Sequence, residues 1–199
     1  GRWIQFAASL YQLRMATGFK KEVQQHSIVV VGNFNPAIFQ PAWFSSKGLI
    51  GENEAQNAKD ILVHGEIAQM DLGWMQLEVL TEKFQARTTQ DAYFEVLRDL
   101  VVGVFSVLRE TPIRAFGINN VLHYKLSNQE TRDQFAQFLV PNAPWSKVLE
   151  EPKLVKAEFH EAKKAKDLGH FRLGIEASEI LTSDGVKFSI NDHFQVAQQ

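Results

Sequence analysis

One long amphipathic segment, flanked on both sides by strand-like runs, constrains the fold more than any other feature of the sequence. From about Asp91 to Arg109, apolar side chains recur at the spacing of a helix, and charged side chains occupy the opposite face. We expect Thr88 or Thr89 to cap the start of this helix, and Thr111-Pro112 to end it. A single long helix among strands favours a sheet that is covered on one face.

Short β-branched or alternating runs before and after this helix have the patterns of strands. The predicted strands cover residues 26–32, 61–69, 74–81, 113–126, 154–161, 170–178 and 186–196. Residues 84–87 are expected to continue the strand 74–81 past a bend, and residues 127–140 to form a shorter helix capped by Ser127. The sequence therefore predicts an α+β fold, with a mostly antiparallel sheet, one long and one shorter helix packed on one face, and a C-terminal three-strand meander.

The length of 199 residues suits a single domain. We expect residues 21–199 to form this domain, with two lobes that meet near Thr111 as the alternative. Residues 1–20 stand apart, because apolar side chains such as Trp3 and Leu10 recur there at helical spacing. They predict a helix packed on the domain or a remnant of a cloning tag, and the alternative is a helix that docks into a partner.

Composition excludes several classes of function. The chain has no cysteine, which excludes disulfides, thiolate metal sites and cysteine nucleophiles, and which suits a reducing compartment. The formal net charge of −2 creates no field that attracts nucleic acid. No run of about 18 apolar residues is present that would span a bilayer. We therefore expect a cytoplasmic protein that binds neither nucleic acid nor membrane.

The motifs of common enzymes are missing. The sequence contains neither a glycine-rich phosphate loop nor a serine nucleophile elbow. Asp192 and His193 are adjacent on a predicted strand, so their side chains point to opposite faces and do not form an acid–base pair. We therefore name no catalytic residue and no cofactor, and favour a protein that is not an enzyme.

Histidines offer two arrangements that resemble part of a metal site. His64 and Glu66 share one face of a predicted strand, but they supply only two of the three ligands that a site needs. His160, His170 and His193 lie in three different strands of the predicted meander, where an antiparallel register would gather them. The sequence does not determine that register, and exposed strand histidines are the commoner case. We therefore predict no metal site.

The segment from Asn33 to Phe44 combines two prolines with many large apolar side chains. The prolines disfavour a regular strand, and the apolar side chains disfavour a solvated loop. We expect a buried plug at one end of the sheet, with an aromatic interaction surface as the alternative. The residues of this candidate interaction surface are Phe34, Phe39, Trp43 and Phe44.

Four stretches of the chain resemble a group of uncharacterised, conserved bacterial proteins. These stretches are Val30–Phe39 with its Asn-x-Asn-Pro motif, Trp74–Phe84, Thr111–Asn119 and Asn191–Phe194. The resemblance extends from about Ser27 to Phe194 and implies a bacterial, cytoplasmic protein. Its motifs are structural in character, so the resemblance assigns no catalytic residue.

Two functional hypotheses follow. The first is a non-enzymatic interaction or assembly protein that self-associates, or binds a protein partner, through exposed sheet edges and aromatic patches. The second is a small-molecule-binding protein or enzyme with a cavity between the sheet and the helices. The polar anchors for a ligand in the second hypothesis are Arg87, Arg114, His123 and Tyr124.

Overall fold

A computed structural model describes residues 19–163, 168–181 and 184–196 of the chain. Within these residues, nine strands are hydrogen-bonded in the order β2-β3-β4-β5-β1-β6-β9-β8-β7. The α+β fold is confirmed: the sheet is antiparallel, the helices are few, and the last three strands form a meander. The helix expected within residues 1–20 lies outside the described residues, except that Lys20 begins a strand.

The elements agree closely with the predicted ones in the second half of the chain and less closely in the first. The strands are β1 (Lys20–Gly32), β2 (Lys59–Val63), β3 (Ile67–Asp71), β4 (Gln76–Leu80), β5 (Lys83–Thr88), β6 (Ile113–Lys125), β7 (Lys156–Ala162), β8 (Gly169–Ala177) and β9 (Gly185–Gln195). The helices are α2 (Pro41–Ser46), α3 (Glu52–Gln56), α4 (Phe94–Val107) and α5 (Gln129–Leu139), with short 3-10 turns η1 (Pro36–Ile38), η2 (Asp91–Tyr93) and η3 (Trp145–Lys147).

The chain divides into two compact units. Within the described residues, unit 1 takes 19–24, 121–159 and 172–189. Unit 2 takes 25–120, 160–171 and 190–196. The division passes through β6 between Asn120 and Val121.

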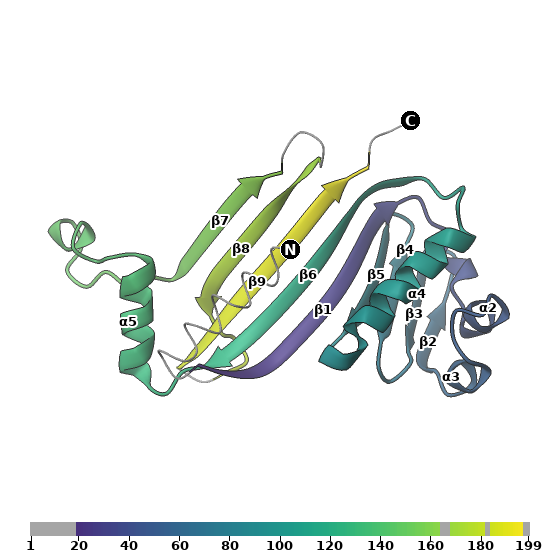
Figure 1. Cartoon of the computed structure of the whole chain (residues 1–199), viewed down its shortest axis with the longest axis horizontal. Coiled ribbons are helices and arrows are strands. Elements are labelled where there is room, and N and C mark those ends of the chain that lie inside the picture. Colours follow the sequence, from purple (N-terminus) through teal and green to yellow (C-terminus); the bar gives the residue numbers. More distant parts are fainter. Residues whose placement is uncertain (1–18, 164–167, 182–183, 197–199) are drawn as a thin grey trace. The chain divides into compact units, whose positions relative to one another are not determined.

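The core of unit 2 lies between α4 and the strands β3, β4 and β5 (Figure 1). Every second residue of these strands is buried, so Met70, Val79 and Phe84 share one face. Leu97 and Val104 of α4 are fully buried against this face. Burying one such side chain contributes about 1.5–3 kcal/mol relative to leaving it in water, so this face anchors the unit.

Two predictions for residues 61–88 are wrong. The chain reverses at residues 64–66, so the single strand predicted over 61–69 is a hairpin of β2 and β3. It reverses again before Lys83, so β5 pairs antiparallel with β4 instead of continuing it. Both errors have one cause, because the alternation of apolar and polar residues continues unchanged through a tight turn. The period therefore shows which residues are buried and does not show where the chain turns back.

The predicted helix caps are also wrong. Neither Thr88 nor Thr89 caps α4, which follows directly on the 3-10 turn η2. Thr88 Oγ1 instead donates to the Trp74 carbonyl at 2.6 Å and accepts from Gln90 N at 3.2 Å. The N-cap of α5 is Asn128, whose Oδ1 accepts from Thr131 N at 2.8 Å, and not Ser127.

The Asn33–Phe44 segment is packed into the core of unit 2. Phe34, Phe39 and Phe44 are all at most 6% exposed, and Trp43 is partly buried. The Phe39 ring lies 5.6 Å from that of Phe84 on β5 and 5.7 Å from that of Trp43. This burial agrees with a structural plug, and it removes three of the four aromatic side chains from the surface.

Unit 1 packs α5 against its strands through one aromatic cluster. The Phe135 ring of α5 lies 6.1 Å from Phe188 of β9 and 5.2 Å from Phe19, with the last pair edge to face. Phe188 and Phe135 are buried, whereas Phe138, one turn further along α5, is 72% exposed. Phe135 is therefore the most deeply buried residue of α5.

Candidate functional site

An open cleft of about 570 Å³ lies in unit 2, beside α4 and the segment that joins α2 to α3. Leu49 and Ile50 line it from the joining segment, and Val96 and Leu100 line it from α4. Val96 is 46% exposed, so this wall of the cleft offers apolar surface. The volume is in the range of protein sites that bind small molecules or side chains of a partner.

Two stacked aromatic rings form one wall of this cleft. The rings of Trp74 and Tyr93 lie 5.3 Å apart with an angle of 20° between their planes. Trp74 is placed by the turn between β3 and β4, where Gly73 adopts a positive φ of 83° and donates its N–H to Asp71 Oδ1 at 2.6 Å. Glycine adopts this backbone conformation at no steric cost, so the turn presents Trp74 to the ring of Tyr93.

Both charged residues that line the cleft are acidic. Glu54 Oε1 accepts a hydrogen bond from Trp74 Nε1 at 2.8 Å, and Glu54 Oε2 accepts one from Gly51 N at 2.9 Å. Asp99 lies on α4 and pairs with its neighbour Arg98 at 2.8 Å on the exposed side of the helix. Apolar walls with an acidic rim suit an apolar group that carries a positive charge.

The polar anchors expected from sequence lie outside this cleft. Arg87 lines a polar groove of about 210 Å³ on the solvent face of β3, β4 and β5, where its Nε donates to Gln76 Oε1 at 2.9 Å. In the same groove, the hydrogen bond from Lys83 holds the pKa of Glu78 below its usual range. Arg114 lies 3.9 Å from Glu82 Oε1 at the surface. The Arg87 and Glu78 side chains of this groove both bind neighbouring side chains.

The other two anchors, His123 and Tyr124, are adjacent residues of β6 in unit 1, so their side chains point to opposite faces. His123 is 4% exposed, and burial lowers the pKa of its imidazole. The Tyr124 ring makes edge contacts with Phe19 and Phe188. His123 and Tyr124 are therefore not brought together into one site.

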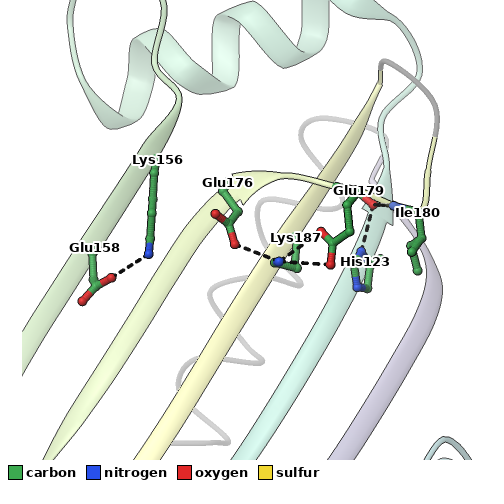
Figure 2. A network of polar contacts seen from close by, with 8 residues as sticks. His123, Lys156, Glu158, Glu176, Glu179, Ile180 and Lys187 are labelled. Carbon is green, nitrogen blue, oxygen red and sulfur yellow. Dashed lines mark hydrogen bonds and ion pairs between the residues drawn. The ribbon is translucent and has the colours of Figure 1, made fainter.

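His123 belongs to a polar network at one end of unit 1 (Figure 2). Ser178 Oγ lies 2.8 Å from His123 Nδ1 and accepts from the backbone N–H groups of Ile180 and Leu181 at 3.3 and 3.0 Å. Ser178 Oγ therefore has three hydrogen-bonding partners, one from the imidazole and two from the backbone. The two backbone hydrogen bonds to Ser178 Oγ stabilise the turn that follows β8.

Lys187 forms the charged part of this network. Its Nζ lies 2.8 Å from Glu176 Oε1 and 3.0 Å from Glu179 Oε2 (Figure 2). The hydrogen bond to Glu176, reinforced by Glu179, raises the pKa of Lys187. The pKa of Glu179 is lowered by the hydrogen bond from its own backbone N–H and by Lys187. These contacts order the segment after β8 and leave no charge without a partner in this network.

A turn that carries exposed apolar side chains lies between α5 and β7 in unit 1, and we call residues 142–152 the Trp145 turn. Trp145, Val148 and Leu149 are 50%, 78% and 54% exposed. Their spacing of three and four residues places them on one side of a helical turn, in which Val148 N and Leu149 N both donate to the Trp145 carbonyl at 2.9 Å. Lys147 lies between them in the sequence.

Two further observations concern features expected from the sequence. His64 and Glu66 lie in the hairpin turn between β2 and β3, so the predicted placement on one strand face is wrong. In the part of the chain that the structure describes, no helix is both long enough and apolar enough to cross a membrane.

Sequence reasoning did not identify the cleft, because its residues come from four separate segments. The alternation predicts a strand at Trp74, and Glu54 and Tyr93 belong to no recognisable motif. Comparison of the sequence with protein-family models and with curated proteins finds no match.

Proposed function

We propose that the protein is a non-enzymatic interaction protein that self-associates, with the Trp145 turn of one copy bound in the cleft of a second copy. The observation that carries this proposal is the chemical match between the two surfaces. The cleft offers apolar walls and an acidic rim, and the turn offers apolar side chains and a lysine. The resemblance to bacterial proteins and the absence of cysteine support a setting in the bacterial cytoplasm.

The apolar part of the match consists of the side chains of the Trp145 turn and the apolar wall of the cleft. Trp145, Val148 and Leu149 have the i, i+3, i+4 spacing with which a helical segment inserts into a groove. Val96 and the Trp74–Tyr93 pair provide partly exposed apolar surface for them. Aromatic anchors in desolvated pockets dominate the binding energy of protein interfaces, so Trp145 is the residue on which the contact depends most.

The polar part of the match gives the contact its orientation. Lys147 is placed beside the apolar anchors, and Glu54 and Asp99 line the cleft that receives them. Opposite charges at the rim of an interface mainly determine register and association rate. The contact should therefore form more slowly at high salt while its apolar centre is retained.

The contact joins two different surfaces, so it is heterologous. A contact of this kind produces closed rings or open filaments, in which every copy donates one turn and receives one turn. A copy that lacks either surface can still use the other one. This property makes the proposal testable by mixing two variants.

The first part of the experiment measures the mass of the full chain by light scattering after size-exclusion chromatography. We expect the wild-type chain to form assemblies larger than one copy, and both Trp145→Ala and Val96→Asp to be monomers. The matched controls are Phe138→Ala, an exposed aromatic residue of α5, and Val102→Asp, a residue of α4 that is 60% exposed and outside the cleft. Both controls should assemble like the wild type.

The second part mixes the two monomeric variants in equal amounts. Trp145→Ala retains its cleft and Val96→Asp retains its turn, so the mixture should form a dimer with one productive contact and no larger species. A monomeric wild-type chain at about 100 µM, well above the affinity of a stable interface, would overturn the proposal. A mixture that stays monomeric would overturn the pairing of this turn with this cleft.

A second candidate function is the binding of a small apolar cation in the same cleft. The stacked Trp74–Tyr93 pair beside Glu54 favours it, because aromatic faces and carboxylates together attract such ligands. A thermal-shift screen with quaternary ammonium compounds tests this function. A shift in the wild type that is absent in Tyr93→Ala and present in Val102→Asp would support it.

A further inference from the structure

Three histidines lie side by side on adjacent strands of unit 2. His160 comes from β7, His170 from β8 and His193 from β9, and these strands are neighbours in the sheet. The ring centroids of His160 and His170 are 4.9 Å apart, and those of His170 and His193 are 4.6 Å apart with nearly parallel planes. The register that the sequence left open therefore gathers all three, with His170 in the centre.

The close approach of β8 to β9 explains how the central pair is placed. Gly169 has a positive φ of 142°, and a Cβ atom at this position would lie 2.1 Å from the carbonyl oxygen of His193. Only glycine fits there, and the next residue of β8 is His170. Gln195 N donates to the Leu168 carbonyl at 2.9 Å, and Lys163 N donates to the Gly169 carbonyl at 3.0 Å. These bonds hold the ends of the three strands in register.

The nearby lysine is held away from the histidine face. Lys163 Nζ contacts Asp192 Oδ1 at 2.6 Å and lies over the Phe194 ring at 2.7 Å. Asp192 and Phe194 flank His193 in β9, so their side chains point to the face opposite the imidazole. The ammonium group therefore does not oppose a cation at the histidines.

We propose that His160, His170 and His193 together bind one divalent transition-metal ion of the class of Zn²⁺, Ni²⁺ or Cu²⁺. Neutral imidazole nitrogen is a preferred ligand of these ions, with metal–nitrogen distances of about 2.0–2.1 Å. Side chains that face each other on adjacent antiparallel strands have Cβ atoms about 4.5–5.5 Å apart, which lets two rings reach one ion. Three protein ligands leave the remaining positions to water.

The rings must turn for the ion to bind. In the described residues, no group of three His, Cys, Asp or Glu side chains is placed to hold a metal ion as it stands. The His170 and His193 rings are stacked, and the His160 ring is tilted by 59° from that of His170. His160 is exposed and His193 is partly exposed, so rotation of these outer rings toward His170 displaces no core side chain. The site is therefore assembled by side-chain rotation on strands that are already in place.

The test is titration calorimetry of the full chain, without a histidine tag, with Zn²⁺, Ni²⁺ and Cu²⁺ in separate experiments. We expect one ion for each chain, and an affinity that falls in acidic solution, because protons compete with the metal for imidazole nitrogen. His170→Asn should abolish binding. His160→Asn and His193→Asn each remove a direct ligand. Loss of a residue that only hydrogen-bonds a metal ligand lowers metal affinity by roughly 10–100-fold, so each of these variants should lower it by more than that.

The matched control is His64→Asn, because His64 lies in the β2–β3 turn of the same unit, outside the trio. It should bind the ion like the wild type. Electron paramagnetic resonance of the Cu²⁺ complex provides a second readout, since three coordinating nitrogens give a hyperfine pattern that changes in each variant. His160→Asn keeps the test decisive if His170→Asn fails to fold, because His160 is exposed.

Absence of binding in the wild type would overturn the proposal. Binding that is unchanged in all three variants, or that is lost equally in His64→Asn, would show an adventitious ion only and would also overturn it. The proposal is independent of self-association, so the oligomeric state of the three variants should match that of the wild type.

Discussion

Lys163 Nζ lies 2.6 Å from Asp192 Oδ1, and both side chains are withdrawn from solvent, with exposed fractions of 10% and 20%. The same ammonium group covers the face of the Phe194 ring, which is itself stacked on Phe116 at 4.7 Å. An ion pair in this environment behaves differently from the surface pairs of the chain, because neither charge is fully hydrated. Its two members therefore depend on each other.

Removing one member of this pair should cost more than removing both. Lys163→Met leaves the Asp192 carboxylate poorly solvated without a partner, and we expect a loss of about 3 kcal/mol in the free energy of unfolding. The double variant Lys163→Met/Asp192→Leu should recover most of this loss. The measurement is urea denaturation, with Lys156→Met as the control, because the exposed Lys156–Glu158 pair contributes at most about 1 kcal/mol. Equal losses in the single and double variants would contradict the prediction.

Truncating an aromatic side chain of the Asn33–Phe44 plug should lower the free energy of unfolding by an amount that increases with the burial of that side chain. Phe44 is fully buried, so Phe44→Ala should lower the free energy of unfolding by about 3–5 kcal/mol through the cavity that it leaves. Trp43→Ala should cost less, because its side chain is partly exposed, and Phe138→Ala on the surface should cost about 0.5 kcal/mol or less. Chemical denaturation of the three variants gives this order. A Trp43→Ala variant that is as stable as the wild type would show that Trp43 is not part of the plug.

The hydrogen bond between Trp74 and Glu54 should be visible in fluorescence. Glu54→Ala removes the acceptor of the indole N–H and of Gly51 N. We expect the free energy of unfolding to fall by only about 1 kcal/mol, because water can hydrogen-bond both donors in the variant. Trp74 should become more hydrated, which shifts the tryptophan emission to longer wavelength. Glu52→Ala, in the first turn of the same helix, should leave the emission unchanged. An unchanged emission in Glu54→Ala would contradict this geometry of the cleft.

The buried His123 should make stability depend on pH. Burial holds the pKa of its imidazole below the ordinary value of about 6.5, so the unfolded chain takes up a proton at a higher pH than the folded chain does. The contribution to stability is complete above about pH 6.5 and is lost as the pH falls toward the lowered pKa of the folded state. Urea midpoints between pH 7.5 and 5.5 should fall more steeply in the wild type than in His123→Gln. His64→Gln is the control and should retain the steep fall.

Several elements could be predicted from the sequence, because the pattern of apolar residues that forms them lies within one short stretch of the chain. The stripe of apolar residues along α4 and the alternation along β6 follow from the geometry of one helix or one strand, so the sequence displays them directly. The Asn33–Phe44 segment was predicted as a buried plug on the same basis. Its prolines disfavour a regular strand, and its aromatic side chains disfavour a solvated loop.

The sequence by itself determined which residues are apolar on each element, and with that the fold class and most of the core. Only the tertiary structure decided where the chain reverses within residues 61–88, because alternation continues through a turn. It also decided the partners of Trp74 and the register of His160, His170 and His193. Those contacts join residues that are far apart in the chain, and their geometry depends on how strands pair, which no local pattern records.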